Sequence, residues 1–307
     1  MPSREKTSTI IWRLIYPILI FIGVEIVIEM VFLFGYMFYL IGTNRISPSD
    51  LGGMTETLNN FAYRISLYIT LARSAALIPI FIVLMRRDKV RDVYYHRYVK
   101  YEPLNRKWLL ILPVLGFAAA MGFNHLVPML LEALQSIIHV VGKTIFGVDW
   151  NVDFFRTYDS LSEIIYSGSI FVQILATAVA APVVEELLFR GLIYKRLRDY
   201  LKFTPSALIS AFVFGIIHGN AVQFLYAFFI GIILAFVYEK FKTVAAPVIF
   251  HGGDNLISVI VTFFIPDEGI GLSIGEYMLL VVVELAVVFL LLWLIDNKIN
   301  RKKIESS

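Results

Sequence analysis

The sequence predicts an all-α, polytopic membrane protein with about eight transmembrane helices and both termini on the cytoplasmic side. Of the 307 residues, 58% are hydrophobic and 17% are charged, whereas a soluble domain has about 45–50% apolar and about 25% charged residues. The apolar residues form long blocks rather than periodic stripes, which is typical of membrane spans. Helices are expected because a lipid-exposed backbone must satisfy its own hydrogen bonds, and the alternating pattern of barrel strands is absent from the sequence.

Eight apolar blocks are expected to form the spans, at about 20 residues for each crossing. The first block is longer than the apolar region of a secretory signal, and we expect it to be retained. The fifth is short for a span. The segment 132–163 is the longest outside the blocks and is expected to include an amphipathic helix near the membrane surface. The blocks lie at 14–41, 61–85, 108–131, 164–184, 205–217, 221–238, 244–265 and 277–295.

Basic residues predict the orientation of the spans. Clusters of Lys and Arg precede the first block and follow the second, fourth, sixth and eighth. Cytoplasmic loops carry the excess of Lys and Arg, so both termini are expected inside the cell. The formal net charge of +3 is small and gives no reason to expect a nucleic-acid partner; the expected partners are membrane lipids.

The chain has no cysteine. This excludes a disulfide framework, a thiolate metal site and a cysteine nucleophile. Catalytic groups, if present, must be carboxylates, imidazoles, hydroxyls or amides.

Ionisable residues inside spans are costly and are usually functional or paired. Glu186 and Arg190 are four residues apart, so they share one helix face and can form an ion pair. Glu185 is turned about 100° from Glu186 and can face a cavity. The alternative is that all three residues extend toward water at a cytoplasmic helix end.

Two histidines favour a functional interpretation. His218 follows Phe214 by one helical turn, and His251 shares a helix face with Asn255. A carboxylate, two imidazoles and a carboxamide suffice to deprotonate water and to stabilise an oxyanion. Asp254 either orients His251 or caps a kink at the neighbouring glycines, and we leave it outside the core set.

Three motifs in order carry a resemblance: Glu185-Glu186 with Arg190, Phe214 with His218, and His251 with Asn255. This pattern resembles the type II CAAX prenyl endopeptidases and their bacterial relatives, the bacteriocin-processing or abortive-infection group. The resemblance covers about 164–265. It implies a helical intramembrane protease with its catalytic core at 161–268, preceded by accessory helices at 1–160 and followed by a last span and basic tail at 269–307.

The resemblance also implies roles for the site residues. Glu185 would be the general base that activates water, with His218 assisting; His251 and Asn255 would stabilise the oxyanion. Glu186 and Arg190 would position the helix. Glu185, His218 and His251 would also suit a three-ligand Zn²⁺ site with an open fourth position, although the HExxH helix of common zinc peptidases is absent. Whether a metal is required stays open.

Three functions are weighed. The first is hydrolysis of a peptide bond in a membrane-associated protein or peptide, in a bacterial plasma membrane. The second is a non-catalytic role in bacteriocin self-immunity or in regulation of a membrane sensor kinase. The third, a proton-coupled carrier, would also use buried Glu and His, but paired broken helices in two corresponding halves are not evident. The intact set of polar motifs favours the peptidase.

Other charged residues within the blocks are expected to form ion pairs between helices. Arg73 is expected to pair with Glu25 or Glu29 of the first block. The alternative for this group is a lateral gate for substrate.

Overall fold

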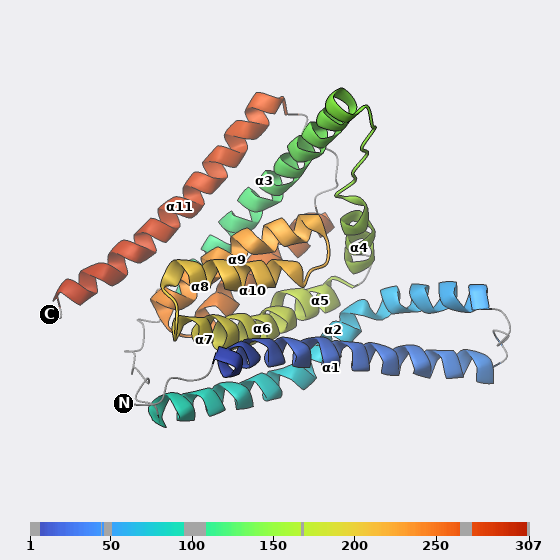
Figure 1. Cartoon of the computed structure of the whole chain (residues 1–307), viewed down its shortest axis with the longest axis horizontal. Helices are drawn as coiled ribbons and strands as arrows, with labels where there is room; N and C mark the ends of the chain where they lie inside the picture. Colours follow the sequence, from blue (N-terminus) through green and yellow to red (C-terminus); the bar gives the residue numbers. More distant parts are fainter. Residues whose placement is uncertain are drawn as a thin grey trace. The chain divides into compact units, whose positions relative to one another are not determined.

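The computed structural model describes residues 7–43, 45, 51–94, 109–166, 169–264 and 272–305. Among these residues the regular structure is helical, and seven helices are long and apolar enough to cross a membrane (Figure 1). The prediction of an all-α polytopic membrane protein is confirmed. Contacts divide the chain into two units, each formed by two stretches: residues 1–100 with 164–199, and residues 101–163 with 200–307.

The first unit begins with two long helices, α1 (Thr7–Gly42) and α2 (Leu51–Tyr94), which lie side by side (Figure 1). α2 has 44 residues, or about 66 Å at about 1.5 Å per residue. It is therefore longer than the hydrocarbon core of a bilayer, which is about 30 Å thick. Arg73 forms an ion pair with Glu25 of α1, and the rings of Tyr36 and Phe61 stack with centroids 3.7 Å apart. The predicted pairing of Arg73 with a first-span acid is confirmed.

The third part of this unit is a helical segment that is continuous from Ile170 to Arg198. Pro182 has no N–H group, and its ring would clash with the carbonyl one turn earlier in a regular α-helix. The backbone widens to π-helical turns just before it, as helices do where the i→i−4 ladder is interrupted. The segment consists of α5 (Ile170–Gln173), η3 (Ile174–Ala180), α6 (Ala181–Glu186), η4 (Leu187–Tyr194) and α7 (Lys195–Arg198). It extends well beyond the predicted end near residue 184.

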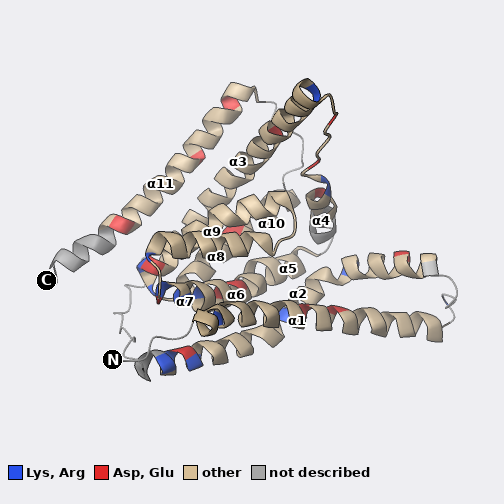
Figure 2. Ribbon diagram, in the orientation of Figure 1, with Lys and Arg blue, Asp and Glu red and all other residues tan. Residues whose placement is uncertain are grey.

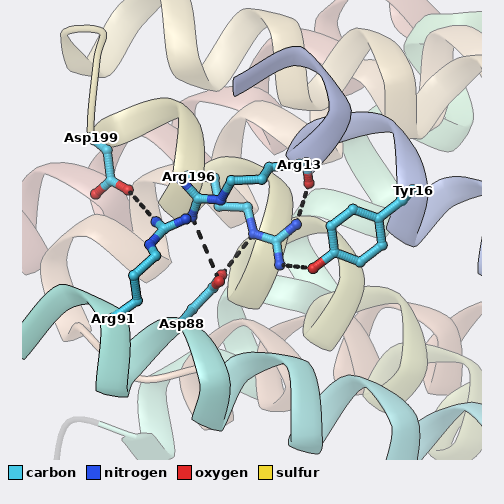
Figure 3. Close-up of polar contacts among 6 residues, drawn as sticks. All are labelled: Arg13, Tyr16, Asp88, Arg91, Arg196 and Asp199. Atoms are coloured by element: carbon cyan, nitrogen blue, oxygen red, sulfur yellow. Dashed lines mark hydrogen bonds and ion pairs between the residues drawn. The ribbon is translucent and has the colours of Figure 1, made fainter. Parts of the chain in front are cut away.

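Arg196 of α7 forms hydrogen bonds with residues of both α1 and α2 (Figure 3). Its Nε donates to Asp88 Oδ2 of α2 at 2.6 Å, its Nη1 donates to the backbone carbonyl of Arg13, and its Nη2 donates to the Tyr16 hydroxyl at 2.8 Å. Arg13 also pairs with Asp88 at 3.5 Å. Arg196 is only 2% exposed, so this set of contacts is an internal polar network rather than a surface cluster.

The second unit is organised around the contact between α3 (Ile111–Val141) and α10 (Ala245–Phe264). A Cβ atom on Gly116 would lie 2.3 Å from the carbonyl oxygen of Phe250, and one on Gly253 would lie 2.8 Å from Pro113 Cα. The two helices thus approach through their backbones, as small residues allow within membranes. α10 is helical without interruption through Gly252 and Gly253.

Three further helices belong to this unit: α8 (Phe203–Ile216), α9 (Ala221–Phe241) and α11 (Ile274–Glu305). α8 corresponds to the short fifth block. Its 14 residues give a length of only about 21 Å, which is shorter than a membrane span. α11 packs along α3, where Glu284 contacts His125 Nδ1 at 2.8 Å.

The segment between α3 and the first unit contains η2 (Gly142–Phe146) and α4 (Arg156–Tyr166). Tyr158 of α4 packs against Val127, Leu131 and Val222, while Arg156 and Asp159 are exposed. One apolar face and one charged face confirm the amphipathic helix predicted for this segment.

Charged residues are sparse along the helices (Figure 2). Basic residues gather at the C-terminal turns of α2 and in α7, as the sequence pattern led us to expect. The basic loop at 95–108 and the acidic loop at 265–271 lie outside the described residues. The orientation across the membrane stays a prediction.

Candidate active site

The six predicted site residues are divided between the two units. Glu185, Glu186 and Arg190 belong to the first unit, whereas His218, His251 and Asn255 belong to the second. Each set is described within its own unit.

Glu186 and Arg190 form a buried ion pair in the middle of the 170–198 segment. Arg190 Nη1 donates to Glu186 Oε1 at 2.8 Å, and both side chains are 0% exposed. A buried charge must be paired, so each residue stabilises the other. The alternative in which these groups extend toward water at a helix end is therefore wrong for Glu186 and Arg190. Glu185, one residue earlier, is half-buried.

The backbone around the acid pair is wider than an α-helix. The π-helical stretch η4 begins directly after Glu186 and contains Arg190. Such stretches are rare and frequently occur at functional sites. Gly191 allows η4 to approach α2 closely, because a Cβ atom there would lie 2.7 Å from Met85 Sδ. Glu185 and Glu186 therefore lie at the junction between an α-helical and a π-helical stretch.

His218 lies in the turn between α8 and α9. Its Nδ1 is 2.8 Å from the carbonyl oxygen of Phe214. Because a carbonyl oxygen only accepts, Nδ1 is the donor in this hydrogen bond, and Nε2 of the neutral imidazole is left as the proton acceptor. Gly219 follows with a φ of 72°, in the left-handed region that glycine favours, and reverses the chain into α9.

Phe214 brings the two predicted histidines together. Its ring makes edge contacts with both imidazoles, at 5.0 Å and 88° to His218 and at 5.8 Å and 86° to His251. Phe214 is 1% exposed and His251 is 5% exposed, so this cluster is internal. Asn255 lies one turn after His251 on α10 and is half-buried. The two histidines therefore contact the same aromatic ring within one unit.

Asp254 and Tyr226 are polar neighbours of this cluster that the sequence motifs did not assign. The Tyr226 hydroxyl of α9 donates to Asp254 Oδ1 at 2.8 Å, and Asp254 is 1% exposed. Tyr226 had no local signal, because its partner lies on the next helix. Asp254 did have a signal in the sequence, because it is an acid in an apolar segment and lies three residues after His251.

Glu185, His218 and His251 have the side-chain types that bind Zn²⁺, but the described part of the structure does not show them grouped as a metal site. Imidazole and carboxylate groups are common Zn²⁺ ligands, and the acceptor Nε2 of His218 has the lone pair that a metal needs. No group of three His, Asp or Glu side chains suited to holding a metal is found within the described part of either unit. The three candidate ligands Glu185, His218 and His251 are contributed by different units.

The segment that carries the predicted site residues is similar in sequence to known proteins. Residues 167–257 match the family model described as type II CAAX prenyl endopeptidase Rce1-like. Over these residues the chain is similar to the CAAX protease family. All six predicted site residues lie inside the match. YdiL, a candidate membrane peptidase of Bacillus subtilis (strain 168), is 31% identical to this chain over 88 residues.

The similarity to the CAAX protease family is limited to part of the chain. The alignment with the Bacillus relative covers 29% of this chain and 36% of that protein, so the chain spans about a third of the relative's length in the matched region. α1, α2, α3 and α11 lie outside the family match. No solved structure gives a significant match.

Proposed function

We propose that this protein is an intramembrane endopeptidase that hydrolyses a peptide bond in a membrane-associated protein or peptide. The observation that carries the proposal is the pair of histidines around Phe214, with His218 Nε2 left as a proton acceptor. The CAAX protease match over 167–257 and the relative's printed description support the same activity.

In the proposed reaction Glu185 is the general base. Its carboxylate takes a proton from a water molecule, and His218 Nε2 assists by accepting a hydrogen bond from the same water. The water oxygen then bonds to the carbonyl carbon of the scissile peptide. Glu186 and Arg190 do not enter this chemistry; their buried pair holds the segment that carries Glu185.

The second half of the reaction concerns the negative charge that develops on the carbonyl oxygen. His251 and Asn255, one turn apart on α10, can donate hydrogen bonds to that oxyanion. Collapse of the tetrahedral intermediate breaks the carbon–nitrogen bond, and the proton held by Glu185 passes to the leaving amine. Where Zn²⁺ is bound, Glu185, His218 and His251 would hold it and it would supply Lewis-acid polarisation.

The substrate class follows from the setting. The segment 170–198, which carries the acid motif, and α10, which carries His251 and Asn255, are long and apolar enough for a membrane, so the substrate must reach these residues from the lipid or from the membrane surface. We propose the bacterial plasma membrane as the location, supported by the relative's bacterial source.

The test is a comparison of peptide termini in membranes from cells that lack the protein and from cells complemented with wild type, Glu185→Gln or His218→Ala. Matched controls are Glu56→Gln, an exposed carboxylate on α2, and His139→Ala, a histidine outside the family match. We expect new termini with wild type and both controls, and none with the two site variants at equal abundance. If the site variants restore the same termini, the peptidase proposal is wrong and a non-catalytic role is favoured.

A further inference from the structure

Asp254 is a buried acid that the proposed reaction does not use. Its side chain is 1% exposed, within an apolar helix. A carboxylate in such a place is costly unless hydrogen bonds and a nearby positive group compensate for the lost solvation. The hydrogen bond from Tyr226 is one such contact. A single neutral hydroxyl donor is a weak partner for a carboxylate, which has about four acceptor positions.

His251 is the neighbouring group that can complete this compensation. It lies three residues before Asp254 on α10, so the two side chains are neighbours on one helix face. Asn255 follows Asp254 on α10, one turn after His251, and Phe214 contacts the imidazole from α8. His251 therefore has the edge contact with Phe214 and a buried acid three residues along its own helix.

The acid itself is held from two sides. Tyr226 fixes Asp254 Oδ1 from α9. On α3, the position of a Cβ on Gly116 would be only 2.8 Å from the Asp254 backbone nitrogen, so that helix lies directly against the backbone of α10. Asp254 thus has little freedom to move away from His251.

We propose that Asp254 is a positioning residue whose carboxylate, clamped by the Tyr226 hydroxyl, orients the His251 imidazole. Partner carboxylates of this kind fix the tautomer and ring orientation of functional histidines. The kinetic consequence rests on the proposed peptidase function, because it concerns how His251 meets the oxyanion. The orientation itself does not, and it can be measured separately.

Two substitutions separate the effect of the Asp254 charge from the effect of its hydrogen bond with Tyr226. Asp254→Asn keeps an oxygen that can accept from Tyr226 but removes the charge. Tyr226→Phe keeps the charge but removes the clamp. Tyr238→Phe, on the same helix as Tyr226, and Asp296→Asn on α11 are the matched controls.

The first readout is nitrogen NMR of the full-length chain in nanodiscs with only histidine labelled, since the chain has five histidines. The His251 signals are identified from their loss in His251→Gln. We expect Asp254→Asn and Tyr226→Phe to shift both ring-nitrogen signals of His251 and to leave those of His139 in place, as folded controls. Unchanged His251 signals in both variants would overturn the inference.

The second readout is cleavage of the substrate identified from the peptide termini. We expect Asp254→Asn to lower kcat by about 10- to 100-fold with KM unchanged, as for other partners of functional histidines. Wild-type kcat in Asp254→Asn would also overturn the inference. If wild-type protein cleaves nothing, the peptidase proposal has failed and the NMR result alone decides the role of Asp254.

Discussion

The two adjacent glutamates have different environments although they are neighbours in the sequence. Glu186 is fully buried against Arg190, whereas Glu185 is half-buried. Removing one partner of a buried ion pair leaves an uncompensated charge, while the loss of a partly accessible carboxylate does not. We therefore expect Glu186 to matter for stability and Glu185 to matter for the reaction.

We predict that Glu186→Gln lowers the free energy of unfolding by about 3–5 kcal/mol, because it strands the Arg190 guanidinium. Glu185→Gln should unfold close to wild type and yet be inactive. Thermal unfolding of both variants in detergent checks this. The double variant Glu186→Gln with Arg190→Met should recover much of the lost stability, since neither charge then remains. Equal stability of the two single variants would contradict the assignment.

At this scale the sequence predicts contacts along one helix better than contacts between helices. The spacing of Glu186 and Arg190 was sufficient to predict their pair. The contact of Phe214 with His218 is also local, four residues apart. Tyr226 and Asp254 are 28 residues apart and come from two helices, so their bond depends on packing that no spacing rule encodes.

At the scale of elements, the apolar blocks located the helices but not all of their ends. The segment 170–198 continues past residue 184 because its charged residues are buried in pairs rather than ending the helix in water. The fifth block gave a helix of 14 residues. Hydropathy reports the solvent that a segment prefers, and it does not report π-helical turns or short helices that pack within the protein.

The contact of α3 with α10 gives a prediction for an element. Gly116→Ala should destabilise the protein by about 1–3 kcal/mol, the usual cost of overpacking, because the new Cβ would meet the Phe250 carbonyl at 2.3 Å. Gly23→Ala on α1 is the control: nothing lies within 4 Å of its Cβ position. In a helix interior that exchange should instead stabilise by roughly 0.5–1 kcal/mol.

Denaturation of both alanine variants in the same detergent gives the comparison. A Gly116→Ala protein as stable as Gly23→Ala would show that α3 and α10 can separate at no cost. The sign of the difference, rather than its size, is the decisive result.

At the scale of the whole molecule, the charge pattern predicts the side of the membrane on which each loop lies. Because the chain has no cysteine, single cysteines can be introduced without background. We predict that Asn151→Cys, before α4, is labelled in intact cells by an impermeant maleimide, and that Lys89→Cys, near the end of α2, is labelled only after the membranes are opened. Both positions are exposed. Labelling of both residues from the same side would refute the orientation.

The Arg196 network has a consequence for the order in which the protein is built. Asp88 and Arg196 are 108 residues apart, and Arg196 and Arg13 are 183 apart. While the ribosome is still making the intervening helices, Arg13 and Asp88 can already pair with each other, but Arg196 is missing from the network. The first two helices can therefore enter the bilayer early, but their anchorage to the segment that carries Glu185 must wait until residue 196 has left the ribosome. We therefore expect α1 and α2 to insert first and to form their contacts with Arg196 later.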